Sequence, residues 1–387
     1  MRIKNISPFY LKLAAEIASL GGMHNAHLHL DRSNTLDESY ILVAEQSILE
    51  TSHISLHEKH HLIHKLHASP AYQSEDFHRR VNHSLDVMIE SNTRRADTLV
   101  DVTADCVGLS ALEMMQTIKR ERQGQIDLQI AAYSPLGFLN DAPERWEVFA
   151  KGAESADFLA ALPEADDHDE YPDHIGFEEH LQRMIHIAKD KRCILHVHTD
   201  QRNEPTESGT ERLIEAVKKY GSPILNDDSN IASPASNPEP SIWAVHMISP
   251  SMYDETRFQR LVDGMLEHNI GLICCPSAAI GMRQLRPLSS PTYNCIPRIL
   301  ELLAAGVHVK LASDNIADIC SPSTTADLTD EVFMLSAAIR YYNVKILAKL
   351  AAGIKLNAED RAVIQSHLHN NNLEIDKVLR ETSQTSA

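Results

Sequence analysis

Short apolar runs alternate with longer amphipathic segments along most of this chain. Apolar runs of about four to eight residues, bounded by polar or glycine-containing segments, are typical of buried strands. The runs of this kind are Met23–His29, Thr98–Val102, Ile126–Tyr133, Phe158–Leu162, Ile194–His198, Ile242–His246, Gly271–Cys275 and His308–Leu311. Segments with helical spacing of apolar residues lie at Leu109–Arg122, Phe177–Lys189, Gly209–Tyr220, Glu255–His268 and Ile296–Ala305. Because strands that alternate with helices form parallel sheets, the pattern predicts an α/β fold, with either an eight-stranded barrel or a doubly wound sheet.

Two insertions interrupt this alternation. The segment Asp31–Asn92 is too long for an ordinary strand-to-helix connection. It carries six closely spaced histidines: His53, His57, His60, His61, His64 and His67. We favour a solvated helix over the barrel mouth to an accessory metal site, because no cysteine or acidic ligand accompanies these histidines in a recognisable order. For the second insertion, Glu164–Glu170, we favour a solvated acidic loop over a cation site, and we expect Glu164, beside the strand end, to face the pocket.

The chain beyond Asp314 has a mostly helical pattern that continues to Leu379, before a polar tail at Arg380–Ala387. We find no internal repeat, no Gly/Ser linker and no low-complexity block. The sequence therefore predicts a single domain over 1–387, with a barrel core at about 23–318 and a helical C-terminal extension at 319–379.

Composition narrows the classes of function. Of the 387 residues, 43% are hydrophobic and 23% are charged, which is ordinary for a globular protein with a substantial core. The net charge of −18 disfavours binding to nucleic acid or anionic membranes, because both need clustered Lys and Arg. The six cysteines form no C-x-x-C pair, the residues before Gly22 do not resemble a signal peptide, and no apolar run is long enough to span a membrane. We therefore expect a cytoplasmic protein. The net charge says little about a small-molecule substrate, whose pocket can differ from the average surface.

Residues that can bind a metal lie at the ends of four predicted strands. His27 and His29 lie in the first apolar run, where the alternation of strand side chains puts both on one face. This pair alone is a weak signal in a chain with 22 histidines. Three later runs, however, end at His198, His246 and Asp314. Because the carboxyl ends of barrel strands converge on one face, the four ends predict a metal site there.

These segments resemble those of the amidohydrolase superfamily, and within it the cytosine-deaminase-like metal-dependent hydrolases. The segments that carry the resemblance are Asn25–Asp31, Val197–Gln201, Ala244–His246 and Ser313–Asp318, together with Asp101–Met115 and Ile126–Phe138. The resemblance extends from about Met23 to about Asp318. It implies a (β/α)8 barrel and one divalent metal ion, zinc or iron.

The resemblance also implies a role for each residue at the strand ends. His27, His29 and His198 would bind the metal. Asp314 would be the fourth ligand and would also accept the proton of the metal's water, while His246 would orient or polarise that water.

Two ambiguities at the metal site are settled by the resemblance. His196 and His198 point the same way in a strand, but the family's spacing, a ligand followed three residues later by a proton-carrying residue, selects His198. Some superfamily members hold a second metal through a carboxylated lysine on the fourth strand. The run Phe158–Leu162 contains no lysine, so we expect a single metal.

The chain departs from the family at Gln201, where the deaminases have a glutamate that shuttles a proton. Glutamine only donates and accepts hydrogen bonds, and a general acid or base contributes about 10²–10⁴ in rate. Three explanations remain open. The substrate needs no protonation there, or Glu204 replaces the missing carboxylate, or the protein binds its ligand without turning it over.

Other positions in the same loops are candidates for substrate contact. They are Asn315, where relatives often have Asp, and Asp318, Arg283, Gln284 and Glu164. The small β-sandwich of many relatives is predicted to be absent, because only about 22 residues precede the first strand and the C-terminal region has a helical pattern. The barrel surface left uncovered gives a weak indication of a homo-oligomer.

The sequence thus predicts a metal-dependent hydrolase that acts on a C–N bond of a small nitrogen heterocycle or cyclic amide. The alternatives are hydrolysis of another bond, such as dechlorination or ring opening of an azine, and a catalytically silent protein that binds metal and ligand. Three histidines and an aspartate suit zinc and iron equally.

Overall fold

The computed structural model describes residues 7–41, 46–51, 53–225, 239–282 and 295–385. Its single sheet has eight parallel strands, which follow one another in chain order from β1 to β8. The strands are β1 (Met23–Leu28), β2 (Thr93–Asp101), β3 (Asp127–Tyr133), β4 (Phe158–Ala161), β5 (Leu195–Thr199), β6 (Ile242–His246), β7 (Ile270–Cys274) and β8 (Val309–Leu311).

The sheet is nearly closed into a barrel. The backbone N–H of Asp314 donates to the carbonyl of His27 (3.0 Å), and a parallel bridge joins Leu28 to Asp314, so the end of the sheet returns to its first strand. The predicted (β/α)8 barrel is therefore confirmed, and the doubly wound alternative is wrong because its strand order would not be sequential.

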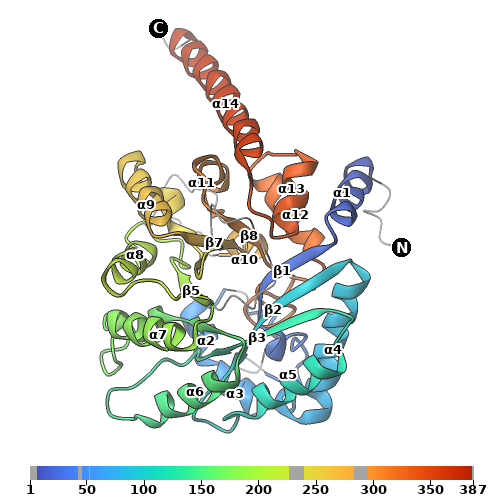
Figure 1. Ribbon diagram of the computed structural model, residues 1–387, viewed down its shortest axis with the longest axis vertical. Helices are drawn as coiled ribbons and strands as arrows, with labels where there is room; N and C mark the ends of the chain where they lie inside the picture. Colours follow the sequence, from blue (N-terminus) through green and yellow to red (C-terminus); the bar gives the residue numbers. More distant parts are fainter. Residues whose placement is uncertain (1–6, 42–45, 52, 226–238, 283–294, 386–387) are drawn as a thin grey trace.

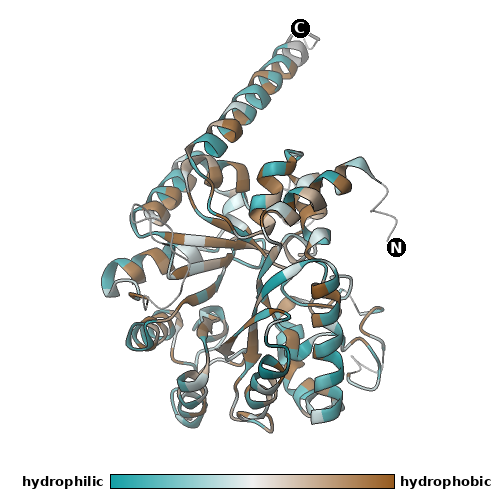
Figure 2. Cartoon of the chain, turned by 45° about the vertical axis from the view of Figure 1, so that its right-hand side comes forward, coloured by the Kyte–Doolittle hydropathy of each residue, from teal (hydrophilic) through white to brown (hydrophobic). Residues whose placement is uncertain are grey.

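Helices surround the barrel (Figure 1). They are α5 (Ser110–Glu121), α6 (Glu144–Ser155), α7 (Phe177–Lys191), α8 (Gly209–Tyr220), α9 (Glu255–Glu267) and α11 (Ile299–Ala305), with the short α10 (Pro276–Ile280) after β7. α9 shows why these segments are helical. The Asp254 side chain caps its first turn by accepting from the N–H of Arg257 (2.9 Å), and Phe258, Leu261 and Met265 are buried at helical spacing. Figure 2 shows the corresponding division, with mainly hydrophobic strands inside and hydrophilic outer faces on the helices.

The close approach of β6 and β7 explains why position 271 in the barrel wall is a glycine. Trp243 is fully buried and pairs in register with Gly271. A Cβ atom at Gly271 would lie 2.4 Å from the indole ring, so only glycine leaves room for this tryptophan.

The long insertion between β1 and β2 is mostly helical. It contains η2 (Leu30–Arg32), α2 (Leu56–His61), α3 (Ile63–His67), η3 (Pro70–Tyr72) and α4 (Ser74–Glu90). No residue of α2 is fully buried, but only Glu58 and His61 are exposed, so this helix is less solvated than predicted. The expectation is wrong for His67, which is buried between the carboxylates of Asp101 (3.0 Å) and Asp105 (2.6 Å). Burial alone would lower the pKa of His67, but these two hydrogen bonds raise it to about 9.

The second insertion is also less solvated than predicted. Its first residues form η4 (Pro163–Asp166), and Asp166 is fully buried. The carboxylate of Asp166 accepts hydrogen bonds from the N–H of Phe138 (2.7 Å) and from the rings of His174 (2.7 Å) and His180 (2.6 Å). This carboxylate therefore ties the loop to the helical layer instead of facing water.

The C-terminal part of the chain is helical, as predicted. It contains α12 (Leu328–Ala338), α13 (Val344–Ala351) and α14 (Ala358–Thr385), and α14 continues through most of the segment predicted to be a tail. The N-terminal helix α1 (Pro8–Ser19) packs on α13, whereas α14 extends away from the barrel (Figure 1). Within the described ranges there is no second sheet, and no helix has the length and apolarity needed to cross a membrane.

Candidate active site

Four candidate metal ligands meet at the carboxyl end of the barrel. His27 and His29 come from the end of β1, His198 from β5 and Asp314 from the segment after β8. Nε2 of His27 lies 3.2 Å from Nε2 of His198. Oδ1 of Asp314 lies 3.3 Å from Nε2 of His29 and 3.8 Å from Nε2 of His27. The structure therefore brings together the four side chains that the resemblance implies as ligands.

The protonation of this cluster suits a divalent cation. Burial lowers the pKa values of His27, His29 and His198 well below the usual value for histidine. All three rings are therefore neutral near pH 7. Nδ1 of His198 bonds to the carbonyl of Ala161 (2.9 Å), which leaves the Nε2 lone pair facing the cluster. Oδ1 of Asp314 is buried and has no hydrogen-bond partner within the described residues. Three nitrogen lone pairs and an unpaired carboxylate oxygen form a donor set that fits zinc or iron.

Two further side chains hold the ligand rings from behind. Nδ1 of His196 lies 3.4 Å from Nδ1 of His27, and the two rings stack with centroids 5.6 Å apart. The guanidinium of Arg32 lies against Nδ1 of His29. Such contacts fix the orientation of a ligand ring, so the structure places His196 behind a candidate ligand and outside the cluster itself.

The backbone is strained at three of the strand ends that form the site. Asp200, His246 and Asp314 have φ angles of 56°, 77° and 62°, in the left-handed region that non-glycine residues rarely adopt. Hydrogen bonds between the ends of β5 and β6 support this conformation at two of them, because the N–H of Met247 donates to the carbonyl of Thr199 and the N–H of Ile248 donates to the carbonyl of Asp200. Strain of this kind is concentrated at functional sites.

His246 and Asp314 form the second half of the cluster. Their ligand atoms and Sγ of Cys275 all lie within 4.8 Å of one another. Burial raises the pKa of the Cys275 thiol well above its usual value, so this sulfur stays protonated and is a poor ligand or nucleophile. Burial lowers the pKa of His246 and raises that of Asp314, while each group partly offsets the shift of the other.

Gln201 is bonded to Glu164 on the neighbouring loop. Nε2 of Gln201 donates to Oε2 of Glu164 (2.7 Å), and the backbone N–H of Asp200 donates to Oε1 (2.8 Å). Burial beside Glu207 and Asp200 raises the pKa of Glu164 to about 8. Glu164 was predicted to face the pocket, but it lies behind Gln201 and does not line the cavity over the histidines. This pair could not be predicted from a local pattern, because its members are 37 positions apart in the chain.

The two cavities at this end of the barrel differ in size. An inner chamber of about 30 Å³ lies directly over the cluster, and an outer cavity of about 870 Å³ shares Leu56, Ala278, Met282, Cys320 and Ser321 with it. The inner chamber is also lined by three residues that the sequence analysis did not select, Arg32, His60 and Tyr133. Arg32 directly follows the His-x-His-x-Asp segment and His60 belongs to the histidine-rich insertion, so only Tyr133 lacked a local signal.

The other predicted substrate contacts are separated by the structure. Asn315 lines the inner chamber, and its Nδ2 donates to Asp318 (2.5 Å). Asp318 is fully buried and also accepts from the N–H groups of Cys320 and Ser321, so it supports Asn315 and the loop and does not face a ligand. Glu204, the candidate substitute for the missing carboxylate, lines the outer cavity and not the inner chamber. Arg283 and Gln284 lie outside the described residues.

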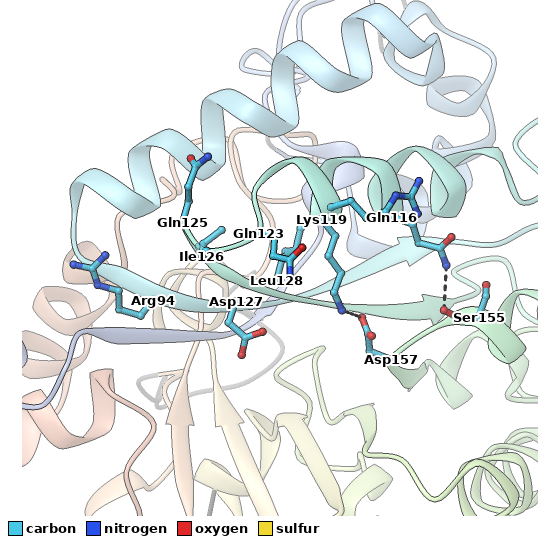
Figure 3. Close-up of a pocket in the computed structure, with 12 residues that line it drawn as sticks. Arg94, Gln116, Lys119, Gln123, Gln125, Ile126, Asp127, Leu128, Ser155 and Asp157 are labelled. Atoms are coloured by element: carbon cyan, nitrogen blue, oxygen red, sulfur yellow. Dashed lines mark hydrogen bonds and ion pairs between the residues drawn. The ribbon is translucent and has the colours of Figure 1, made fainter. Parts of the chain in front are cut away.

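A further cavity of about 720 Å³ lies at the opposite end of the barrel, near the starts of β2, β3 and β4 (Figure 3). Two of its polar side chains already donate hydrogen bonds within the lining. Lys119 pairs with Asp157 (2.7 Å), and Gln116 donates to the carbonyl of Ser155 (3.0 Å). It contains none of the candidate catalytic residues, and catalysis in barrels is a property of the other end.

Comparison with curated proteins identifies distant relatives. No family model matches the chain. An uncharacterized protein of Haemophilus influenzae is 24% identical over 302 residues, covering 77% of this chain and 96% of that protein. A pterin deaminase of Rhizobium rhizogenes is 22% identical over 247 residues, covering 64% of this chain. The match spans about half of the length of the pterin deaminase (51%).

Comparison with solved structures identifies the fold. The 5-methylcytosine deaminase of Klebsiella pneumoniae, in complex with 5-fluorocytosine, superposes with a TM-score of 0.70 and 21% identity, covering 85% of this chain and 72% of that chain. The chain therefore has the fold of this deaminase, in agreement with the fold that the resemblance implies.

Proposed function

We propose that this protein is a mononuclear metal-dependent hydrolase that acts on a C–N bond of a small nitrogen heterocycle. The observation that carries the proposal is the convergence of three neutral imidazoles and an unpaired, buried carboxylate oxygen at the carboxyl end of a barrel. The similarity to a pterin deaminase and the fold shared with a 5-methylcytosine deaminase support the substrate class.

The residues of the chain have distinct parts in this proposal. His27, His29, His198 and Asp314 hold the ion, which when bound supplies Lewis-acid activation of a water molecule. Asp314 accepts a proton, and its buried position, which raises its pKa, favours this role. His246 stays neutral because burial lowers its pKa, and its ring orients or polarises the attacking water and stabilises the charge that develops on the oxygen.

The test combines metal content with ammonia release. Purified full-length protein, reconstituted with zinc or iron, is screened against aminopyrimidines, aminotriazines, pterins and cyclic amides, with His198→Ala as the matched variant. We expect about one metal per chain and ammonia release in the wild type, and neither in the variant. A wild-type protein that binds no metal under these conditions would sink the proposal.

Gln201 favours a second candidate, a protein that binds metal and a heterocyclic ligand without releasing ammonia. An amide cannot carry the proton that a deaminase delivers at this position. Bound metal with no turnover, in both the wild type and Gln201→Glu, would support this candidate. Ammonia release by Gln201→Glu alone would show that the site is competent except for its missing carboxyl group.

A further inference from the structure

The carboxyl group of Glu164 is held by two consecutive residues that follow β5. One oxygen accepts the backbone N–H of Asp200, and the other contacts the side-chain amide of Gln201. Gln201 is itself only 6% exposed, and its side chain lines the inner chamber over the histidine cluster. One end of the Gln201 amide is therefore committed to Glu164 while the remainder of the side chain faces the ligand space.

The proton of Glu164 determines which end of the amide is committed. A carboxylate only accepts hydrogen bonds, so it binds the NH₂ end of Gln201 and turns the carbonyl end away. When Glu164 is protonated, the proton is on Oε2, because Oε1 already accepts the N–H of Asp200. The acid then donates to the carbonyl of Gln201 and turns the NH₂ end away. The two amide orientations have nearly the same shape, so the exchange needs no rearrangement of the loop.

We propose that Glu164 sets the hydrogen-bond polarity that Gln201 presents to a ligand in the inner chamber. With Glu164 ionised, Gln201 offers an acceptor and selects a ring N–H. With Glu164 protonated, Gln201 offers a donor and selects a bare ring nitrogen. Glu164 is thus a positioning residue that acts through Gln201. The proposal rests on the proposed function only in assuming that the ligand is a nitrogen heterocycle.

The proposed substrate class makes both polarities useful. In an amino-substituted heterocycle, the ring nitrogen beside the C–NH₂ carbon is a bare acceptor. After the amino group is replaced by oxygen, the lactam form carries an N–H at that nitrogen. The two orientations of Gln201 therefore match the substrate-type and product-type rings of one deamination.

The charges around Glu164 keep both states accessible near neutral pH. Burial beside Glu207 and Asp200 raises the pKa of Glu164, and Arg202 acts in the opposite direction. The other charged side chains around the cavity that Glu164 lines are Asp167, Asp169, Glu170, Glu204 and Arg212.

The experiment measures binding and does not need turnover. Dissociation constants of the zinc-loaded full chain are determined by calorimetry for amino and oxo rings, cytosine with uracil and adenine with hypoxanthine, between about pH 6.5 and 8.5, using pairs whose rings do not titrate in that range. In the wild type we expect the preference for the oxo ring over the amino ring to rise about tenfold with pH, since one net hydrogen bond corresponds to roughly this factor. In Glu164→Gln the ratio should not change with pH. Glu215→Gln, an exposed glutamate on α8, should behave as the wild type.

Three outcomes overturn the inference: a ratio that does not change with pH in the wild type, a wild-type pH dependence retained in Glu164→Gln, or no binding of either pair. If Glu164→Gln fails to fold, Gln201→Leu serves instead, because removing the amide should abolish the pH-dependent preference while Glu164 remains. Binding with the expected pH dependence but without ammonia release supports this inference and overturns only the proposed function.

Discussion

The two ends of the barrel both bury histidines and carboxylates, but they treat them differently. At the amino-terminal end, Asp97 accepts from His24 (2.8 Å) and Arg95 (2.8 Å), and Lys310 pairs with Glu239. At the carboxyl end, the rings of His27, His29 and His198 face one another, and among the described residues Oδ1 of Asp314 has no hydrogen-bond partner. The paired charges at the amino-terminal end satisfy one another, so removing one partner would be destabilising. The unpaired ligand atoms at the carboxyl end carry a free-energy cost that a bound cation would remove.

The pKa shifts agree with this difference. Burial alone would raise the pKa of Asp97, but His24 and Arg95 hold it well below its usual range. Burial raises the pKa of Asp314, and His246 and Arg32 offset only part of that shift. The carboxylate at the amino-terminal end is thus committed to the fold, while the one at the carboxyl end remains available for chemistry.

The largest expected effect is at the unpaired carboxylate. Asp314→Asn should lower kcat/KM by about 10³-fold, because it removes a ligand and the proton acceptor together. The thermal midpoint of the metal-free protein should change little, since Oδ1 makes no hydrogen bond there. Steady-state kinetics and thermal unfolding measure the two quantities. A large loss of stability with activity retained would reverse the roles of the two ends.

Removing the charge of Asp97, the paired carboxylate, should affect stability and not activity. Asp97→Asn leaves His24 and Arg95 without their buried partner and should cost about 3 kcal/mol of unfolding free energy, with little change in metal content. Urea denaturation and metal analysis test this. Asp127→Asn, an exposed carboxylate at the same end of the barrel, is the matched control and should be near neutral.

His67 is a buried histidine that, unlike the candidate ligands, is paired with two carboxylates. Its pKa in the folded protein, about 9, lies above the value of about 6.5 for an unfolded histidine. Its stabilisation is therefore complete below about pH 6.5 and is lost as the pH rises through 9, a change of about 2–3 kcal/mol. Denaturation at pH 6 and pH 9.5 should show this loss in the wild type and a smaller one in His67→Gln. An equal loss in both proteins would mean that other groups carry it.

The smallest effect is expected at Glu204. Because it lines the outer cavity and not the inner chamber, Glu204→Gln should change kcat by less than about twofold. A decrease of kcat by about 10²-fold, the size expected for a lost general acid or base, would instead identify Glu204 as the substitute for the missing glutamate. The loop that carries Glu204 would then have to move into the inner chamber.

Much of the fold could be predicted from the sequence because the signals are local. Each strand is a short apolar run, and the eight predicted runs agree with the observed strands to within a few residues except at β2, which begins earlier, at Thr93. The start of β2 was missed because the charged residues Arg94 and Arg95, which are exposed and half-buried respectively, interrupt the apolar pattern there. The solvated interpretation of the insertions failed at His67 and Asp166, because their buried partners lie elsewhere in the sequence.

The sequence by itself determined the alternation of strands and helices and the order of ligand-type residues at the strand ends, because both depend on spacing along the chain. Only the tertiary structure decided which groups meet. It paired Asp97 and left Asp314 unpaired, placed His196 behind His27, and joined Glu164 to Gln201 across two loops. These outcomes depend on barrel closure and loop packing, which bring distant residues within hydrogen-bond distance and exclude the water that would otherwise satisfy them.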